Sequence, residues 1–328
     1  MESFKAIVVR KENEEVSYQL EDVSLADLSE GEVLIKVSYS SVNFKDMLAV
    51  QANGGVIRDY PMIPGIDLSG TVVSSSNEQY SEGQQVLVTG FGTGVSHTGG
   101  FAEYARIPAE WIVPLPDGLT LKDAMIFGTA GFTAALSIMA LQKNGMSVES
   151  DPHILVTGST GGVGSVALQI LSKIGYKNIA ALVRKDYQVE AAKSLGATEV
   201  VFATDLEDRP KPLSKAKYHY VLDTVGGNVA AALIPQIHYG GSMSMCGNAG
   251  GVQLPTNVLP FILRGVNLLG IDSVNVPIEK RSPIWTKIAD EWNISDTALT
   301  KEIALQEVPE TIEAVKNGQH LGRTIIKF

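Results

Sequence analysis

A glycine-rich turn between an apolar strand and an amphipathic helix is the feature that most constrains this fold. Residues 154–164 read Ile-Leu-Val-Thr-Gly-Ser-Thr-Gly-Gly-Val-Gly. Glycines let backbone N–H groups approach a pyrophosphate without Cβ clashes, and a helix N-terminus favours negative charge. Apolar residues then recur at helical spacing from Val163 to Ile174, and Gly175 predicts the helix end. The segment predicts the first β-α unit of a dinucleotide-binding domain; a tight turn without a ligand is the alternative.

The chain shows two kinds of secondary-structure pattern, which differ before and after about residue 122. Its 328 residues are more than one ordinary core needs, which predicts two domains. The first 122 residues contain short β-branched runs such as Glu32–Tyr39 and Gln85–Val88, punctuated by Gly and Pro, and predict a β-rich domain. From about Leu121, strand-like runs alternate with helical patterns, as in the β-α-β units of a parallel sheet. These runs are 153–157, 178–183, 199–202, 219–222, 242–246 and 267–271.

The end of the second of these strands distinguishes between two cofactors. Val183 is followed by Arg184 and Lys185, where NAD-dependent enzymes of this fold carry an acidic residue for the ribose 2′-OH. A carboxylate repels a 2′-phosphate, whereas a guanidinium binds it bidentately. The sequence therefore predicts NADPH, bound at Val183, Arg184 and Lys185; a merely solvated loop is the alternative. Asp186 is expected to cap the helix that follows.

Composition argues against several function classes. A formal net charge of −10 and a pI of about 5.1 disfavour anionic partners, so we expect neither nucleic-acid nor membrane binding. Cys246 is the single cysteine, which removes an intramolecular disulfide or a cysteine-based zinc site, and we expect it to be a packing residue. No uninterrupted apolar run approaches the roughly 20 residues that cross a bilayer, and the N-terminal stretch lacks a signal-peptide core. We expect a cytoplasmic protein.

Several ordered segments resemble one superfamily over essentially the whole chain. Besides the glycine turn they are Asn43–Asp46, Pro64–Gly70, Gly99–Tyr104, Gly128–Ala134 and Gly322–Thr324. In these segments the chain resembles the medium-chain dehydrogenase/reductase superfamily. The resemblance is greatest to its zinc-free, quinone-oxidoreductase-like branch, which includes the bacterial acrylyl-CoA reductases.

The resemblance implies an α/β fold in which a Rossmann nucleotide-binding domain is inserted in a β-rich GroES-like catalytic domain. The implied boundaries are 1–122 for the GroES-like domain, 123–296 for the Rossmann NADPH-binding domain, and 297–328 for a C-terminal return to the catalytic domain. In that return we expect a short helix and a final strand, Thr324–Lys327. The resemblance also implies a homodimer formed through the nucleotide domain, with Val266–Ile271 as either the pairing edge strand or an interior strand.

The same resemblance implies the site residues. Asn43, Phe44 and Asp46 would lie near the nicotinamide, with Asn43 and Asp46 as catalytic candidates, unless these two only cap a short helix. Arg58 is a further catalytic candidate; alternatively it contacts a CoA phosphate or is a surface charge. The remaining cofactor-binding candidates are Thr129 and Thr133 on the nicotinamide side, Ser159, Thr160, Gly161 and Gly162 at the pyrophosphate, and Cys246, Gly247, Ile271, Ser273 and Asn317 over the cofactor.

The zinc ligands of related alcohol dehydrogenases have no counterpart here, so no metal is expected. Gly65-Ile66-Asp67 stands where those enzymes typically have Gly-His-Glu, and the five histidines show no chelating spacing. Without a metal, a conjugated acceptor is easier to reduce than a simple ketone, because hydride addition at Cβ spreads charge into an enolate. The tyrosine proton donor of mitochondrial-type enoyl thioester reductases is missing from Met47–Asn53, so the proton would come from water or an unidentified acid.

Three functions remain open from the sequence. The first is NADPH-dependent reduction of an activated C=C bond, with acrylyl-CoA or a short enoyl-CoA as the acceptor. The second is an NADPH:quinone oxidoreductase that uses the same cleft. The third belongs to another class, a non-catalytic NADPH-binding sensor or structural protein. In the first two the partner is a small conjugated molecule, an enoyl thioester or a quinone.

Overall fold

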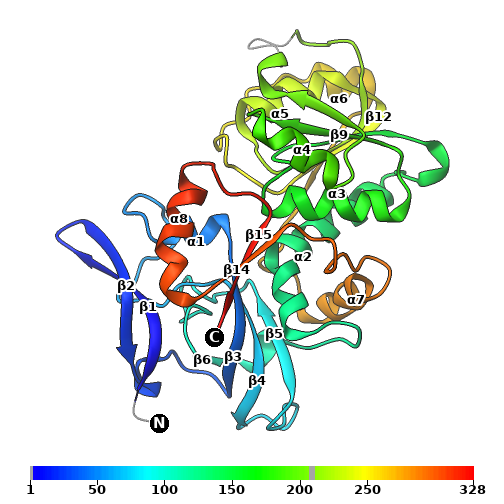
Figure 1. Cartoon of the computed structure of the whole chain (residues 1–328). Coiled ribbons are helices and arrows are strands. Elements are labelled where there is room, and N and C mark those ends of the chain that lie inside the picture. The colour runs from blue at the N-terminus through cyan, green and yellow to red at the C-terminus, as the bar shows by residue number, and fades with distance from the viewer. Residues whose placement is uncertain (1–2, 207–210) are drawn as a thin grey trace. The chain divides into compact units, whose positions relative to one another are not determined.

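A computed structural model describes residues 3–206 and 211–328 of the chain. Its contacts divide the chain into two compact units. The first consists of residues 1–130, 273–290 and 300–328, and the second of residues 131–272 and 291–299. The first unit is therefore assembled from three separate stretches of the chain, coloured blue to green, orange and red in Figure 1.

A seven-stranded sheet forms the centre of the first unit. Its strand order is β14-β15-β3-β4-β5-β7, with β6 paired to β3, and only β14 and β15 are parallel neighbours. Along β3, Val33, Ile35 and Val37 are buried and Lys36 between them is exposed, which is the period-two pattern of a sheet with one apolar face. The strands are β3 (Val33–Val42), β4 (Asp67–Ser75), β5 (Gln85–Thr89), β6 (Tyr104–Ile107), β7 (Ile112–Pro114), β14 (Thr300–Ile303) and β15 (Arg323–Lys327).

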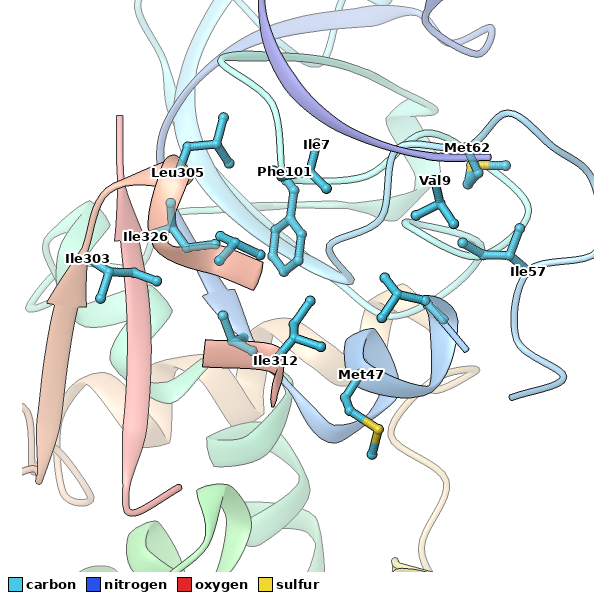
Figure 2. Close-up of a cluster of buried hydrophobic side chains, with 14 residues drawn as sticks. Ile7, Val9, Met47, Ile57, Met62, Phe101, Ile303, Leu305, Ile312 and Ile326 are labelled. Atoms are coloured by element: carbon cyan, nitrogen blue, oxygen red, sulfur yellow. The ribbon is translucent and has the colours of Figure 1, made fainter. Parts of the chain in front are cut away.

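An apolar cluster joins this sheet to the other elements of the first unit. Among them are the hairpin β1 (Phe4–Glu12) and β2 (Glu15–Val23) and the helices α1 (Phe44–Ala49) and α8 (Val308–Lys316). Figure 2 shows Ile7 and Val9 of β1, Met47 of α1, Ile312 of α8 and Ile326 of β15 meeting there. Helix α1 follows the candidate residue Asn43, and Met47 fixes that helix in the core.

The second unit is a six-stranded parallel sheet with helices. Its strand order, β10-β9-β8-β11-β12-β13, is the Rossmann order that the sequence predicts. The strands are β8 (His153–Val156), β9 (Asn178–Val183), β10 (Glu199–Phe202), β11 (Tyr218–Asp223), β12 (Ile237–Met245) and β13 (Asn267–Gly270). The helices are α3 (Gly162–Ile174), α4 (Tyr187–Ser194), α5 (Gly227–Leu233) and α6 (Leu259–Arg264).

Helix α3 confirms the sequence pattern around the glycine turn. It ends at Ile174, and Gly175 caps it in the left-handed conformation with a φ of 107°. Its apolar residues Val166 and Ile170 are fully buried, as the helical spacing predicts. The strand bounds differ slightly from the prediction: β12 begins at Ile237, earlier than the predicted 242, because its first residues include the glycine pair Gly240-Gly241 and carry no apolar pattern.

The longest helix, α2 (Leu121–Lys143), spans the division between the two units. It is long and apolar enough to cross a membrane, but 78% of its most apolar window is buried inside the protein, as a core helix is. The helix is broken at Gly128, whose φ of 51° and ψ of −156° are not helical. This break carries Thr129 out of the regular turn.

Residues 273–290, which include helix α7 (Ile278–Ala289), belong to the first unit. Buried Arg281 secures this stretch by donating to the carbonyl of Thr89 at 2.7 Å and to the carbonyl of Val274 at 2.8 Å. The guanidinium also lies 4.2 Å from the ring centroid of Phe91. The predicted domain division 1–122, 123–296 and 297–328 stays a prediction.

Candidate active site

The glycine turn of the second unit leaves room for nothing larger than glycine at two positions. Gly158 has a φ of 54°, and a Cβ there would overlap the hydroxyl of Thr224. A Cβ on Gly164 would lie 2.7 Å from the Cα of Ser159. Helix α3 begins directly after the turn with Gly161 at its N-cap, and the first N–H groups of a helix have no acceptor within it. The turn can therefore bring backbone N–H groups close to an anion.

A buried carboxylate braces this turn from the neighbouring strand. Asp223, at the end of β11, accepts from the hydroxyl of Thr157 at 2.7 Å and from the N–H of Gly226 at 2.8 Å. The hydroxyl of Thr224 donates to the carbonyl of Thr157 at 2.9 Å. Burial raises the pKa of Asp223 above its ordinary value. These bonds join the carboxyl ends of β8 and β11, the edge at which ligands bind in such sheets.

Ser159 and Thr160 use their side chains for the fold. The Ser159 hydroxyl donates to the carbonyl of Leu182 at 2.8 Å, and the Thr160 hydroxyl accepts from the amide of Gln188 at 2.9 Å. Both residues are buried. We therefore expect Ser159 and Thr160, like Gly161 and Gly162, to bind the pyrophosphate through their backbone N–H groups.

Arg184 and Lys185 lie at the carboxyl end of β9 with exposed side chains. The side-chain oxygen of Gln188 accepts from the N–H of Arg184 at 2.8 Å and of Lys185 at 3.0 Å. Asp186 is the N-cap residue of α4, as expected, but its side chain makes no capping hydrogen bond to the helix. Gln188 orders this turn instead, and both cations face solvent.

A second constellation in the first unit is centred on Asp67, which is fully buried at the start of β4. Its Oδ2 accepts from the Ser41 hydroxyl at 2.6 Å, the Asn43 amide at 2.7 Å and the Thr129 N–H at 2.9 Å. Its Oδ1 accepts from the Thr129 hydroxyl at 2.5 Å. One carboxylate thus holds two other chain segments in place, residues 41–43 and Thr129; we call this set, with Arg323, the Asp67 network.

Arg323, the first residue of β15, is the cation of this network. It is buried, and its Nη2 donates to the Ser41 hydroxyl at 2.8 Å and lies 3.9 Å from Oδ2 of Asp67. It also donates to the carbonyl of Ile126 at 2.9 Å. A Cβ on Gly128 would overlap Oδ2 of Asp67 and lie 2.8 Å from Arg323. Glycine at this helix break is therefore what lets α2 approach the network.

Asp46 is a second buried carboxyl beside Asp67. Its oxygens accept from the N–H of Asn43 at 2.8 Å and of Ile66 at 3.0 Å. Burial, and then the charge of Asp67, raise the pKa of Asp46 to about 7. The first of these bonds caps helix α1, as the alternative from the sequence predicted, while the side chain of Asn43 turns to Asp67 instead.

The other predicted site residues are distributed over both units. In the first unit, Phe44 is 41% exposed on α1, and Arg58 is exposed on a loop. The remaining candidates are Ser273 and the exposed Asn317 in the first unit, and buried Thr133 and partly exposed Cys246, Gly247 and Ile271 in the second. Burial raises the pKa of the Cys246 thiol to about 12, which agrees with a packing role and makes it a poor nucleophile. The roles of all these residues stay predictions.

The sequence reading assigned no role to Asp67, Ser41, Arg323 or Asp223. Asp67 and Arg323 lie inside segments that carry the family resemblance, and from the sequence Asp67 is only a departure from the Gly-His-Glu motif of zinc enzymes. For Asp223 the sequence offers one indication, its place directly after the predicted strand 219–222. Their partners are too distant in sequence to be found by pattern.

The histidines do not form a metal site among the residues that the structure describes. No group of three or more His, Cys, Asp or Glu side chains there is arranged to hold a metal ion. His219 and His238 do come together, with stacked rings 4.2 Å apart, at the end of the second unit's sheet where the strands begin. That end is opposite to the glycine turn.

Two stretches of the chain match models of dehydrogenase domains. Residues 29–117 match the alcohol dehydrogenase GroES-like domain, and residues 162–289 match the zinc-binding dehydrogenase domain. The chain belongs to the medium-chain dehydrogenase/reductase superfamily, with the GroES-like and Rossmann-type folds that the sequence predicts. It is an oxidoreductase of the type that its full-length relatives represent.

Three relatives define that type. YhfP of Bacillus subtilis, which carries a provisional name as a quinone oxidoreductase, is 43% identical over 99% of both chains. The acrylyl-CoA reductase AcuI of Ruegeria pomeroyi is 42% identical over 98% of both chains. The yhdH oxidoreductase of Salmonella enterica, solved in complex with NADP, is 40% identical over 99% of both chains with a TM-score of 0.95. The structure of YhfP has NAD bound, and it matches with a TM-score of 0.95 at 42% identity over the full length of both chains.

Proposed function

We propose that this chain is an NADPH-dependent reductase of activated carbon–carbon double bonds, with acrylyl-CoA or another short enoyl-CoA as its substrate. The observation that carries the proposal is the buried Asp67 network, because Ile66 beside it stands where zinc-dependent relatives typically have a histidine ligand. A site organised by hydrogen bonds around a carboxylate offers no Lewis acid to a simple carbonyl. It suits an acceptor whose own conjugation delocalises the charge.

The second unit fits a 2′-phosphorylated dinucleotide. Gly158 and Gly164 leave no room for a Cβ, so the backbone can approach a pyrophosphate, and Arg184 and Lys185 present exposed cations at the end of β9. When bound, NADPH supplies the hydride. The NADP complex of the Salmonella relative supports this cofactor, whereas the NAD complex of YhfP supports NADH as the alternative.

In the first unit, Asn43, Phe44 and Thr129 are the residues that we assign to the nicotinamide and the acceptor. Asp67 accepts hydrogen bonds from Asn43 and Thr129, so the positions of both are set before a substrate binds. Asp46 holds Asn43 through its backbone N–H and is itself fully buried. We therefore assign Asp46 a positioning role, and the proton for Cα to water.

The acceptor class follows from this arrangement and from the relatives. Hydride addition to Cβ of an enoyl thioester gives an enolate, whose charge is shared between carbon and oxygen without a metal. Two full-length relatives above 40% identity are named acrylyl-CoA reductases, from Ruegeria pomeroyi and, as a probable assignment, from Escherichia coli. A short acyl chain is therefore our first choice.

A parallel acceptor screen tests the proposal. The purified enzyme and NADPH are offered acryloyl-CoA, crotonyl-CoA and benzoquinone, and NADPH oxidation is followed with mass spectrometry of the products. We expect the largest kcat/KM with acryloyl-CoA and formation of propionyl-CoA. Absence of NADPH oxidation with every conjugated thioester would contradict the proposal.

A quinone is the second candidate acceptor. The provisional name of the YhfP relative favours it, and a flat conjugated ring meets the same chemical requirement as an enoyl thioester. In the screen above, this function predicts that benzoquinone exceeds both thioesters in kcat/KM. A quinone carries no phosphate, whereas the coenzyme A thioester does, so the two candidate acceptors also differ in charge.

The proposed assembly is a homodimer, and the proposed location is the cytoplasm. Strand β13 is the last strand of its sheet, so one of its sides is open to pairing with a second copy. Exposed apolar side chains lie close to it in sequence; they are Val252, Val258, Ile262 and Leu263. Exposed apolar side chains and an open strand edge are both features of interfaces between subunits.

A further inference from the structure

A cavity in the first unit is lined by two cations that take no part in the Asp67 network. Its volume is about 430 Å³, and its walls come from α1, from the loop around residues 55–59 and from the loop around residues 92–97. Its lining includes Lys45, Val56, Arg58, Asp59, Val95 and Ser96. Lys45 lies on α1 between Asn43 and Asp46 of the candidate active site.

The charges in this cavity are unpaired. Within the described part of the chain, neither Lys45 nor Arg58 forms an ion pair or a side-chain hydrogen bond, and Asp59 beside them forms none either. The lining therefore carries one net positive charge, in a chain whose net charge is −10. Local positive charge on an acidic protein attracts an anionic ligand.

The walls of the cavity are fixed by the fold. Gly94 donates its N–H to the carbonyl of His97 at 2.8 Å, and Ser96 to the carbonyl of Gly92 at 3.0 Å. A Cβ on Gly94 would lie 2.7 Å from the backbone of Gly65, so this loop is packed directly against its neighbour. Helix α1, on the other side, is held by the buried Asp46 and by Met47.

The geometry points to a phosphate subsite: the Lys45–Arg58 cavity binds the phosphate groups of a coenzyme A thioester. This assignment rests on the proposed reduction of the C=C bond of an enoyl-CoA. It adds recognition of the coenzyme A part of the substrate to recognition of its acyl chain. A guanidinium binds phosphate bidentately and an ammonium acts on it as a point charge. Val56 and Val95 add apolar surface of the kind that the methyl groups of the pantetheine arm can contact. A quinone would gain nothing from these charges.

A comparison of two thioesters tests this assignment. Acryloyl-CoA and acryloyl-pantetheine, which lacks phosphate, are each assayed at saturating NADPH with the wild type and the variants Lys45→Ala, Arg58→Ala and both together. We expect the ratio of kcat/KM for the CoA thioester over the pantetheine thioester to fall about tenfold in each single variant and further in the double variant, mainly through KM. Pyrophosphate should compete with acryloyl-CoA in the wild type.

Lys36→Ala, an exposed lysine on β3 of the same unit, is the matched control and should keep the wild-type ratio. Equal losses with both thioesters, or no competition by pyrophosphate, would overturn the subsite. If the wild type reduces neither thioester, the proposed function fails separately, and calorimetry then decides the subsite. Tighter binding of CoA than of pantetheine, lost in the double variant, supports it, and equal binding overturns it.

Discussion

At the scale of single residues, Asp46 makes the stability of the fold depend on pH. Burial and the charge of Asp67 raise its pKa from 3.8 to about 7, so between these values the folded protein keeps a proton that the unfolded chain has released. Unfolding therefore releases a proton in this window, and the free energy of unfolding falls as pH rises through it. The total fall is about 1.4 kcal/mol for each unit by which the fold raises the pKa of Asp46.

The variant Asp46→Asn removes this titration. We expect its free energy of unfolding in urea to vary less between pH 4 and 7 than that of the wild type, although the variant is less stable at low pH because one backbone N–H loses a carboxyl partner. Asp117→Asn, at an exposed carboxyl of the same unit, is the control and should keep the wild-type slope. Parallel slopes for Asp46→Asn and the wild type would show that this carboxyl does not titrate in the window.

Arg184 carries the choice of cofactor. The variant Arg184→Ala should lose about 2 kcal/mol of NADPH binding, roughly a 30-fold rise in Kd, because one charge-assisted contact to the 2′-phosphate is removed. NADH binding should change little. Fluorescence titration with both cofactors measures the ratio, with Lys177→Ala as an exposed control in the same unit. An unchanged NADPH/NADH ratio would remove Arg184 from the 2′-phosphate site.

At the scale of elements, the break in α2 is the feature most sensitive to a single methyl group. The variant Gly128→Ala places a Cβ against Asp67 and Arg323 on a backbone with positive φ, so we expect a loss of at least 1–3 kcal/mol and a reduced kcat. Gly83→Ala has a φ of 84° and open space around its Cβ, and it therefore reports the backbone strain alone. Thermal unfolding of the two variants side by side should show the larger drop in Tm for Gly128→Ala; equal drops would argue against crowding at the network.

The open edge of β13 gives a prediction about assembly. Glutamates in the double variant Ile262→Glu/Leu263→Glu would be buried without partners in a dimer interface, so we expect a monomer in sedimentation velocity runs in which the wild type is a dimer. Val73→Glu, at an exposed valine of the first unit, should leave the dimer intact. A wild-type monomer would exclude the proposed assembly.

Helices and strands with a local sequence pattern were predictable from the sequence, whereas the hydrogen bonds between residues far apart in the chain were not. Helix α3 and the strand β9 have the predicted bounds within a residue because helical spacing and β-branched runs are local patterns. The hydrogen bond from Arg323 to the carbonyl of Val42 joins residues 281 positions apart, and no periodicity reports such a pair. The same limit applies to Asp223, which braces a turn 66 positions away.

At the scale of the whole molecule, catalysis without a metal is a testable property. The sequence lacks the zinc ligands of its alcohol dehydrogenase relatives, and the described residues hold no metal-binding group. We expect dialysis against a chelator to leave both kcat and Tm unchanged, with elemental analysis below one metal ion per chain. A loss of activity that zinc restores would contradict the proposed chemistry.

Strand β15 follows the whole of the second unit in the sequence, yet it lies between β14 and β3 in the sheet of the first unit. On a translating ribosome, β3 and β4 emerge early, and their neighbour β15 arrives only when the nucleotide-binding sheet has been synthesised. Until then the nascent polypeptide exposes the Tyr39–Val42 edge of β3 and a carboxylate, Asp67, without its guanidinium. We expect this interval to be the stage of synthesis at which the chain is most prone to aggregate.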